Sequence, residues 1–404
     1  MGCRSITGFM FRRQSSTASS ISISLDPNRP VIKNVQKEID FALILLRFQN
    51  PRELFAFSPV SISLGFSLIH SGASGSTRDQ IRDFVLKGTS HKHFEKHFAK
   101  LNYSLLRAEN GTEMCMANHL FADTALEVKN DYLQKIERLF RSGVTQLPFF
   151  ENPHGSAVSI NTFVGMKTKN HIGRFMNDLN FPIGRISALT VLNFLVSGAS
   201  TILVNAAYFM SEWSTKFDGA YTTKLDFHSS PMGKRQVDFL SSSHPVLYSE
   251  NNEFRVLTLR YKAESFAMSI FLPINRFGLR EAIMGLNSVK VQNLLTRASE
   301  EQMNIQIPKW NIECDFPLTE AMPLLGVAEM CGPFAELDDI APGASISQVM
   351  HKVLIEVGEN GTTSTTGAPR KNQCPPDNVD FLADHPFMFL ITKDLHPLFI
   401  GTHY

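Results

Sequence analysis

The sequence predicts an α+β fold, because helix-like segments occupy the first half of the chain and strand-like segments the second. Apolar residues recur at helical spacing between residues 31 and 48, whereas residues 201–209 form a nearly unbroken apolar run. No Pro-, Gly- or Ser-rich linker divides the two halves, and no internal repeat is present. We therefore expect residues 30–404 to form one domain.

The helical segments differ in how much of their surface is apolar. Residues 31–48 have one apolar face, and Pro51 ends that helix. Residues 59–70 are apolar on nearly all sides and should be buried, whereas residues 91–107 are rich in His and Lys and should face solvent. Further helices are expected at residues 131–140, 155–170 and 279–296.

The strand segments are apolar and rich in β-branched residues. Residues 201–209 should lie in the middle of a sheet, where both faces of a strand are covered. Other strands are expected at residues 114–121, 265–272, 303–314 and 345–357, with two more between residues 378 and 404.

The composition is that of a globular protein rather than a nucleic-acid-binding or membrane protein. Hydrophobic residues make up 43% of the chain, and its formal charge is only +1. No apolar run reaches the ~18 residues that a membrane span needs. The cysteines are widely spaced and match neither a disulfide framework nor a metal site, so we expect free thiols. They are Cys3, Cys115, Cys314, Cys331 and Cys374. We expect a monomer with no metal and no cofactor.

Residues 1–29 differ in character from the rest of the chain. They contain Arg4, Arg12 and Arg13, many Ser and Thr, and no acidic residue before Asp26. They lack the apolar core of a secretory signal, and a disordered leader and a mitochondrial presequence both fit. The myristoylation pattern is incomplete, since it needs Ser or Thr at the sixth position. A cytoplasmic location is favoured, and the extracellular space is the alternative.

The sequence contains no recognisable enzyme motif. There is no GxSxG elbow, P-loop, HExxH or dinucleotide-binding fingerprint. Ser, His and Asp are present, but scattered residues do not define a catalytic triad. We therefore expect a protein that is not an enzyme.

A run of small residues near the C-terminus points to function. Residues 361–368 read Gly-Thr-Thr-Ser-Thr-Thr-Gly-Ala and lie between the strand-like segments 349–357 and 381–390. Thr favours the pleated state, and small side chains need little room in a covered sheet. Such a segment can stand out as a loop or enter a sheet as a strand. That property suggests a mechanical device rather than an active site.

This segment and its flanks resemble the hinge and reactive loop of the serpins, the serine protease inhibitor superfamily. Other motifs follow in family order, and the resemblance covers residues 30–404. They are Phe57-Ser58-Pro59-Val60-Ser61, Gly72-Ala73-Ser74-Gly75-Ser76, Ile160-Asn161-Thr162-Phe163-Val164, Leu203-Val204-Asn205-Ala206-Ala207 with Trp213 and Phe217, and Gly401. Each string alone is weak, but their order is specific. An intracellular, invertebrate-type member is one form that this resemblance can take.

The resemblance implies a fold with three β-sheets, of which a large central sheet A is the main one, and with eight or nine helices. It also implies an exposed reactive loop at about residues 359–380. The implied function is suicide inhibition of a target protease, of the serine class or of the cysteine class. The protease cuts the loop and forms an acyl-enzyme, and the cleaved loop inserts into the main sheet as a new strand. A metastable native fold supplies the energy.

The resemblance further assigns a shutter, where two central strands must separate. Polar side chains suit that place, because their hydrogen bonds can hold a buried seam and be remade after a strand enters. The matching residues are Ser58, Ser61, Asn205 and His351. Ordinary helix capping by Ser58 and Ser61 is compatible with that role.

The place where insertion begins is matched by Trp213, Lys309 and Glu359. A Lys309–Glu359 ion pair would pin the hinge while the loop is outside the sheet, and would be worth ~1 kcal/mol if exposed. Two unrelated surface charges are the alternative interpretation. The hinge itself comprises Glu359, Gly361, Thr362, Thr363 and Ser364.

The loop departs from the family pattern in two ways that argue against efficient inhibition. Gly367 and Pro369 follow the hinge, and Pro lacks the N–H that a central strand needs. The family's cleaved bond lies about sixteen residues beyond the hinge glutamate, ~50 Å at strand rise, which falls at a Pro-Pro pair here. Trypsin-like proteases would cut earlier. The candidate scissile region is Arg370, Lys371, Asn372, Gln373, Cys374 and Pro375.

A non-inhibitory serpin that acts as a binding, carrier or chaperone-like protein is the alternative function. Pro369 and the early basic pair favour it. Glycosylation sequons occur at Asn102, Asn110 and Asn360. A glycan on Asn360 would obstruct the hinge, which favours an intracellular location for an inhibitor.

Overall fold

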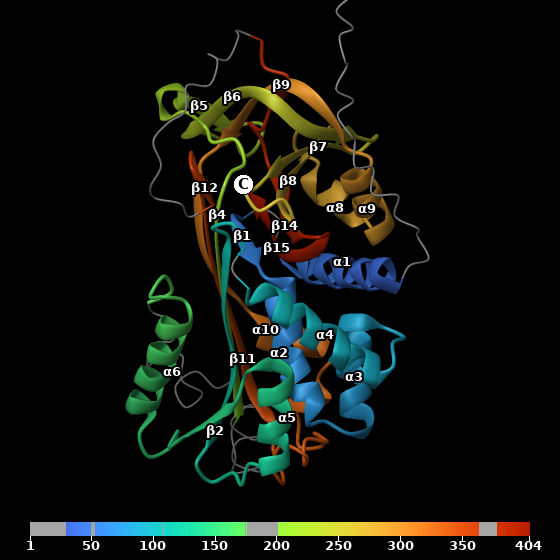
Figure 1. Ribbon diagram of the computed structural model, residues 1–404, viewed down its shortest axis with the longest axis vertical. Helices are drawn as coiled ribbons and strands as arrows, with labels where there is room; N and C mark the ends of the chain where they lie inside the picture. Colours follow the sequence, from blue (N-terminus) through green and yellow to red (C-terminus); the bar gives the residue numbers. More distant parts are fainter. Residues whose placement is uncertain (1–29, 50–52, 108, 174, 176–200, 363–377) are drawn as a thin grey trace, which may run out of the picture.

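The computed structural model describes residues 30–49, 53–107, 109–173, 175, 201–362 and 378–404, arranged along a tall β-sheet (Figure 1). Within these ranges the α-helices are α1 (Pro30–Phe48), α2 (Pro59–Ser71), α3 (Gly75–Leu86), α4 (His91–Leu105), α5 (Asn130–Phe140), α6 (Pro153–Lys167), α8 (Leu279–Gly285), α9 (Ser288–Thr296) and α10 (Leu318–Leu324). Short 3-10 helices are η2 (Gly219–Tyr221) and η3 (Glu329–Cys331). The α+β class is confirmed.

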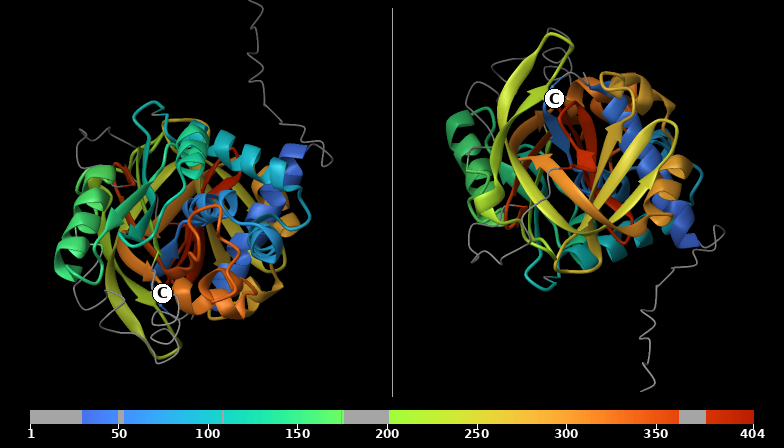
Figure 2. Two further views of the ribbon diagram at one scale, coloured as in Figure 1. Left: turned by 90° about the horizontal axis from the view of Figure 1, so that it is seen from below. Right: turned by 90° about the horizontal axis from the view of Figure 1, so that it is seen from above.

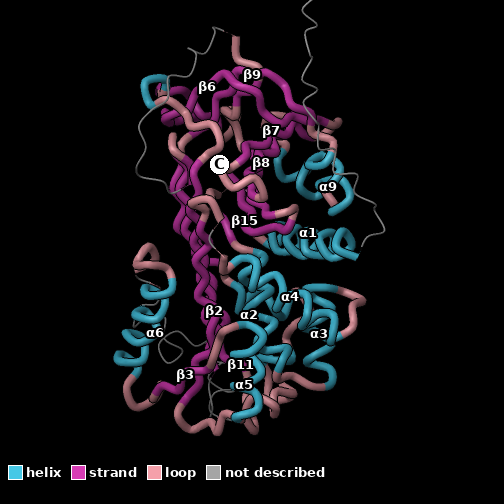
Figure 3. Tube along the Cα trace, in the orientation of Figure 1, coloured by secondary structure: helices cyan, strands magenta, loops and turns pink. Residues whose placement is uncertain are grey.

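The tall sheet, whose long strands are drawn in magenta in Figure 3, has six strands in the order β10-β11-β12-β4-β2-β3. They are β2 (Glu113–Asp123), β3 (Val144–Leu147), β4 (Thr201–Glu212), β10 (Trp310–Phe316), β11 (Ile346–Gly358) and β12 (Gly361–Thr362). β4 and β11 run parallel, while β2 and β10 run antiparallel to their central neighbours, so the sheet is mixed. Residues 201–209 are all buried, as their apolar character predicts.

The two faces of this sheet are covered by different helices. α6 packs on one face, and α2 contacts β2 and β4 from the other (Figure 1). Every residue of α2 is buried, as expected. Its serines are tolerated there because their hydroxyls donate to backbone carbonyls one turn earlier, as from Ser63 to Pro59 and from Ser67 to Ser63.

The second sheet has nine strands and forms the upper part of the molecule (Figures 1 and 2). They are β1 (Phe55–Phe57), β5 (Thr223–His228), β6 (Lys234–Glu250), β7 (Phe254–Arg260), β8 (Phe266–Pro273), β9 (Ser299–Pro308), β13 (Phe381–Leu382), β14 (Phe387–Lys393) and β15 (His396–His403). We expected two smaller sheets beside the main one. They are continuous here because β6, with 17 residues, pairs with β5, β9 and β7 in turn.

Three segment boundaries differ from the sequence predictions. Residues 279–296 form two helices, because Asn287 caps α9 by accepting a hydrogen bond from the Lys290 N–H. Residues 303–314 are divided between β9 and β10, which lie in different sheets and meet at Lys309. Residues 378–404 contribute three strands rather than two, the first only two residues long.

Two further expectations concern the described residues. Cys115, Cys314 and Cys331 are free thiols, and burial raises the pKa of Cys331 to about 12. None of the helices in the ranges given above is long and apolar enough to cross a bilayer. The predicted leader, residues 1–29, lies outside the described residues.

Candidate functional site

The two central strands of the tall sheet separate at their upper end. β11 and β4 pair directly up to Leu354 and Tyr208. Beyond that point β12 lies between them, and Thr362 pairs with Val357 on one side and Ser211 on the other. The first residues of the predicted hinge therefore already form a short strand inside the sheet (Figure 1).

Two residues of β12 fit this narrow position in different ways. Gly361 has φ +150, and a Cβ atom there would lie 2.0 Å from the Ser211 carbonyl oxygen, so only glycine fits. Thr362 is fully buried, and its hydroxyl is 2.7 Å from the hydroxyl of Tyr261. Burial raises the pKa of Tyr261, which stays protonated. The Tyr261 ring stacks on Trp213 with centroids 4.6 Å apart.

Glu359, just before β12, is held from three directions. Its carboxylate accepts hydrogen bonds from Lys309 Nζ at 3.0 Å and Thr222 Oγ1 at 3.1 Å. Its carbonyl accepts one from the Phe217 N–H at 2.9 Å. Partial burial opposes ionisation, but these hydrogen bonds and the Lys309 charge outweigh it, so the pKa of Glu359 lies below its usual value. The Lys309–Glu359 pair expected from the sequence is present.

Trp213 fixes the backbone on either side of Glu359. Its indole N–H donates to the Gly358 carbonyl and its backbone N–H to the Asn360 carbonyl, both at 2.9 Å. We call Trp213, Lys309 and Glu359 the insertion site. A main-chain segment held by so few groups can be released without disturbing the core.

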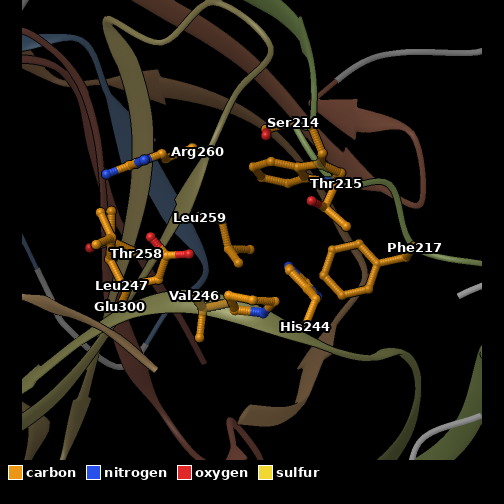
Figure 4. A pocket seen from close by; sticks show the side chains of 12 residues that line it. Ser214, Thr215, Phe217, His244, Val246, Leu247, Thr258, Leu259, Arg260 and Glu300 are labelled. Atoms are coloured by element: carbon orange, nitrogen blue, oxygen red, sulfur yellow. The ribbon is translucent and has the colours of Figure 1, made fainter. Parts of the chain in front are cut away.

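A cavity of about 220 Å³ adjoins the insertion site (Figure 4). Trp213, Phe217, His244 and Leu259 line it, with Arg260 among the polar groups. The rings of Phe217 and His244 meet edge to face, with centroids 6.3 Å apart. Burial lowers the pKa of His244, which is therefore neutral near pH 7. The space lets the segment that holds the hinge shift more easily than a close-packed core would.

The predicted shutter lies lower in the same seam. His351 of β11 and Asn205 of β4 are register partners, and their side chains are hydrogen-bonded. The Ser58 N–H donates to His351 Nε2 at 2.9 Å, so Nε2 carries no proton and Nδ1–H donates to the side-chain oxygen Oδ1 of Asn205. Burial lowers the pKa of His351 to about 3. The histidine is therefore neutral and has both nitrogens satisfied.

The Asn205 amide extends this network. Its nitrogen donates to the Ser61 carbonyl and to the Asn118 side-chain oxygen, both at 2.5 Å. The Ser61 hydroxyl donates to the same Asn118 oxygen at 3.0 Å, and the Ser58 hydroxyl donates to the Leu398 carbonyl at 2.7 Å. We call Ser58, Ser61, Asn205 and His351 the shutter cluster.

Asn118 and Tyr261 are functional-site residues that the sequence interpretation missed. Asn118 is a polar residue within the apolar strand 114–121, and it pairs in register with Asn205. That interruption was a usable signal. Tyr261 gave none, because a tyrosine at the end of a strand is ordinary.

The geometry makes the shutter cluster incompatible with an added strand. A new strand between β11 and β4 would move His351 and Asn205 apart by ~4.8 Å, beyond hydrogen-bonding reach. Their bond must therefore break, and each partner must find new partners on the inserted backbone.

α6 also opposes expansion of the sheet. Ile160 is fully buried against β2 and β4, and the Phe163 ring lies 4.5 Å from His119 and 5.5 Å from Phe121. Burial, with a smaller effect of the Lys167 charge, lowers the pKa of His119 to about 4. This apolar contact must slide or open before the sheet can gain width.

Several candidate residues lie outside the described residues. They are Thr363, Ser364, Arg370, Lys371, Asn372, Gln373, Cys374 and Pro375.

Comparison with known proteins gives a consistent assignment. The profile of the Serpin (serine protease inhibitor) family matches residues 37–404. The plasma serine protease inhibitor of Mus musculus is 27% identical over 375 residues, covering 90% of this chain and 88% of the mouse protein. Antithrombin-III of Mus musculus is 30% identical over 368 residues, covering 85% of this chain and 74% of the mouse protein.

A solved structure shows the same fold. The crystal structure of human thyroxine-binding globulin complexed with thyroxine matches with a TM-score of 0.80 and 21% identity. The match covers 92% of this chain and 97% of that one.

Proposed function

Because this chain belongs to the serpin family, we propose that it inhibits a protease as a suicide substrate, by inserting its cleaved reactive loop between β11 and β4. The observation that carries the proposal is β12. The hinge already pairs with both central strands, so the sheet accepts the chain at the point where insertion would begin.

The register of β12 defines where the rest of the loop would go. Extending the Thr362 pairs one residue at a time in a cleaved, inserted chain would bring Ala368 between Asn205 and His351. The same extension would bring Asn372 beside Thr201, at the far end of β4. The inserted strand would therefore pass through the shutter cluster at a small residue. Each added residue would contribute backbone hydrogen bonds to both neighbours and cover apolar sheet surface.

This register also bears on the cleaved bond. A protease holds several residues on either side of the bond it cuts, and those residues cannot pair in the sheet. A cut after Arg370 or Lys371 would leave part of the seam between β11 and β4 unfilled. A cut after Gln373 or Cys374 would leave one or two residues beyond Asn372, so less of the seam would stay unfilled. We therefore propose that trypsin-like proteases cut between Arg370 and Asn372 and mostly escape, whereas a protease that cuts later is trapped.

Mass spectrometry of the released C-terminal fragment tests this part of the proposal. With trypsin, we expect a fragment that begins at Lys371 or Asn372 and an active protease. A covalent complex between trypsin and the chain cut at that bond would contradict the length argument.

The second candidate function is that of a non-inhibitory serpin. In the extended register Pro369 would stand between Val204 and Met350, where its missing N–H removes a hydrogen bond from the middle of the sheet. Pro369→Ala separates the two functions. It should speed trapping of a protease that the native chain inhibits slowly, and it should change nothing in a protein that never inserts its loop.

A further inference from the structure

Three side chains that are distant in the sequence meet where α1, α4 and β15 come together. Glu38 lies on α1, His97 on α4 and His396 at the start of β15. His97 Nε2 is 2.5 Å from one carboxylate oxygen of Glu38, and His396 Nδ1 is 2.7 Å from the other. One ligand atom from each residue can be chosen so that all three lie within 4.8 Å of one another.

Glu38 is an unusual residue at this position. Only 3% of it is exposed, although most glutamates in proteins reach solvent. A carboxylate is buried only where cations or strong donors compensate it. Here both compensating groups are imidazoles. An imidazole nitrogen can either donate a hydrogen bond or bind a divalent transition metal.

A second layer of contacts orients the His97 ring. The Asn34 amide lies 3.1 Å from His97 Nδ1 and 2.9 Å from His93 Nε2. An amide can present its oxygen or its nitrogen to the same neighbour. When a metal is bound at Nε2, the Asn34 oxygen turned toward His97 would accept the Nδ1 proton of the ring. Metal-binding histidines are commonly fixed in this way.

We propose that Glu38, His97 and His396 form a binding site for Zn²⁺ or a similar divalent transition metal, with one coordination position left for water. Two imidazole nitrogens and a carboxylate are a frequent zinc ligand set. An ion bound 2.0–2.2 Å from each ligand atom would hold neighbouring ligand atoms roughly 3.4 Å apart. The imidazole nitrogens now lie 2.5 and 2.7 Å from the Glu38 oxygens, so they need to separate from the carboxylate by less than about 1 Å to admit the ion. The ion would take the place of the ring protons that now face Glu38; each such proton would move to the other nitrogen of a neutral imidazole or, from an imidazolium, pass to solvent.

Metal at this site would join three elements that otherwise meet mainly through side-chain packing. α1, α4 and the start of β15 would be fixed to one ion. Since the unfolded chain keeps these ligands far apart in sequence, the metal would stabilise the folded state selectively. No local motif predicts the site, because its residues lie at positions 38, 97 and 396.

To test the proposal, the full-length protein is first treated with a chelator. Zn²⁺ is then titrated into it while calorimetry measures the heat of binding. We expect one bound ion per chain, and an affinity reduced about 100-fold or more in the His97→Ala, His396→Ala double variant. Glu38→Gln, which keeps the size of the side chain, should also weaken binding strongly. Asn34→Ala should weaken it about 10-fold, as expected for a positioning residue.

His154→Ala removes an exposed histidine on α6 and serves as the matched control, with unchanged zinc affinity. Co²⁺ provides a spectroscopic readout, since its visible absorption should appear with the native chain and be lost in the double variant. Undiminished zinc binding by the double variant would overturn the proposal. So would the absence of any zinc binding by the native chain, provided that circular dichroism shows both proteins folded.

Discussion

His351 uses both ring nitrogens in the seam between β11 and β4, one to accept from Ser58 and one to donate to Asn205. A buried histidine with one acceptor and one donor partner has only one acceptable tautomer. The shutter cluster is thus closed by a small number of specific bonds. Apolar contacts could also hold the two strands together, but they would fix the relative position of the strands less specifically than hydrogen bonds do.

Thr362 is the residue whose replacement should separate cleavage from trapping. It is fully buried against Tyr261 before any insertion occurs. Thr362→Arg would have to bury an unpaired charge, at a cost of several kcal/mol, or expel the hinge from the sheet. The variant should be cut normally but form no stable protease complex on a denaturing gel. Thr124→Arg, at an exposed threonine, is the control and should behave as the native chain.

Individual residues show where sequence reasoning succeeded and where it ended. The strings around Ser58, Asn205 and His351 were sufficient to expect these side chains in one place. Asn118 was missed although its polarity interrupts an apolar strand. The partnership of Thr362 with Tyr261 could not have been predicted, because it joins residues about one hundred positions apart through a side-chain contact that no local pattern encodes.

At the scale of elements, the hinge is a short strand restrained by the partly exposed Lys309–Glu359 ion pair, by side-chain hydrogen bonds and by backbone hydrogen bonds. The side-chain hydrogen bonds come from Thr222, Trp213 and Tyr261. Lys309→Ala should lower the stability of the whole protein by less than ~1 kcal/mol, because such a pair contributes little. It should nonetheless speed hydrogen exchange at Gly361 and Thr362, since the opening of β12 is local.

Lys290→Ala is a matched control for that experiment. Lys290 pairs with Glu253, and the side chains of both lysines are similarly exposed, 40% for Lys290 and 41% for Lys309. Its removal should leave exchange at the hinge unchanged. Equal exchange at β12 in the two variants would show that the Lys309–Glu359 pair does not restrain the hinge.

The type of most elements followed from periodicity, whereas their limits and partners did not. Residues 201–209 are a buried central strand, as an apolar run of that length predicts. The sequence did not reveal that β9 and β10 are separate strands, because Pro308 ends one strand and Trp310 begins the next. Only Lys309 lies between them, and there the chain passes from one sheet to the other. Which strands become neighbours depends on tertiary packing and not on local sequence.

At the scale of the whole molecule, buried histidines make stability depend on pH. Burial lowers the pKa of His351 and His403 to about 3 and that of His119 to about 4. Below pH 6.5 the unfolded chain therefore binds more protons than the folded one, and stability falls as the pH falls. Each histidine contributes up to ~1.4 kcal/mol per pH unit. His396 acts in the opposite sense, because Glu38 raises its pKa and offsets its burial.

The unfolding midpoint in urea should thus be clearly lower at pH 5 than at pH 7.5. Below pH 4.5 the loss should steepen, since the pKa values of Glu38 and Glu95 lie at about 2 and their ionised forms are stabilised in the fold. His403→Phe, in a site lined by Phe227, Phe387 and Trp310, should reduce the slope between pH 6.5 and 5. If the dependence of stability on pH were the same in His403→Phe as in the native chain, His403 would not contribute to it.

The central claim is that the chain traps a protease by inserting its loop into the tall sheet. Incubation with a panel of trypsin-like and papain-like proteases, followed by a denaturing gel, tests it most directly. We expect a covalent complex with at least one protease that cuts beyond Lys371, and its absence in Thr362→Arg. Cleavage by every protease in the panel, with full recovery of protease activity and no complex, would contradict the claim.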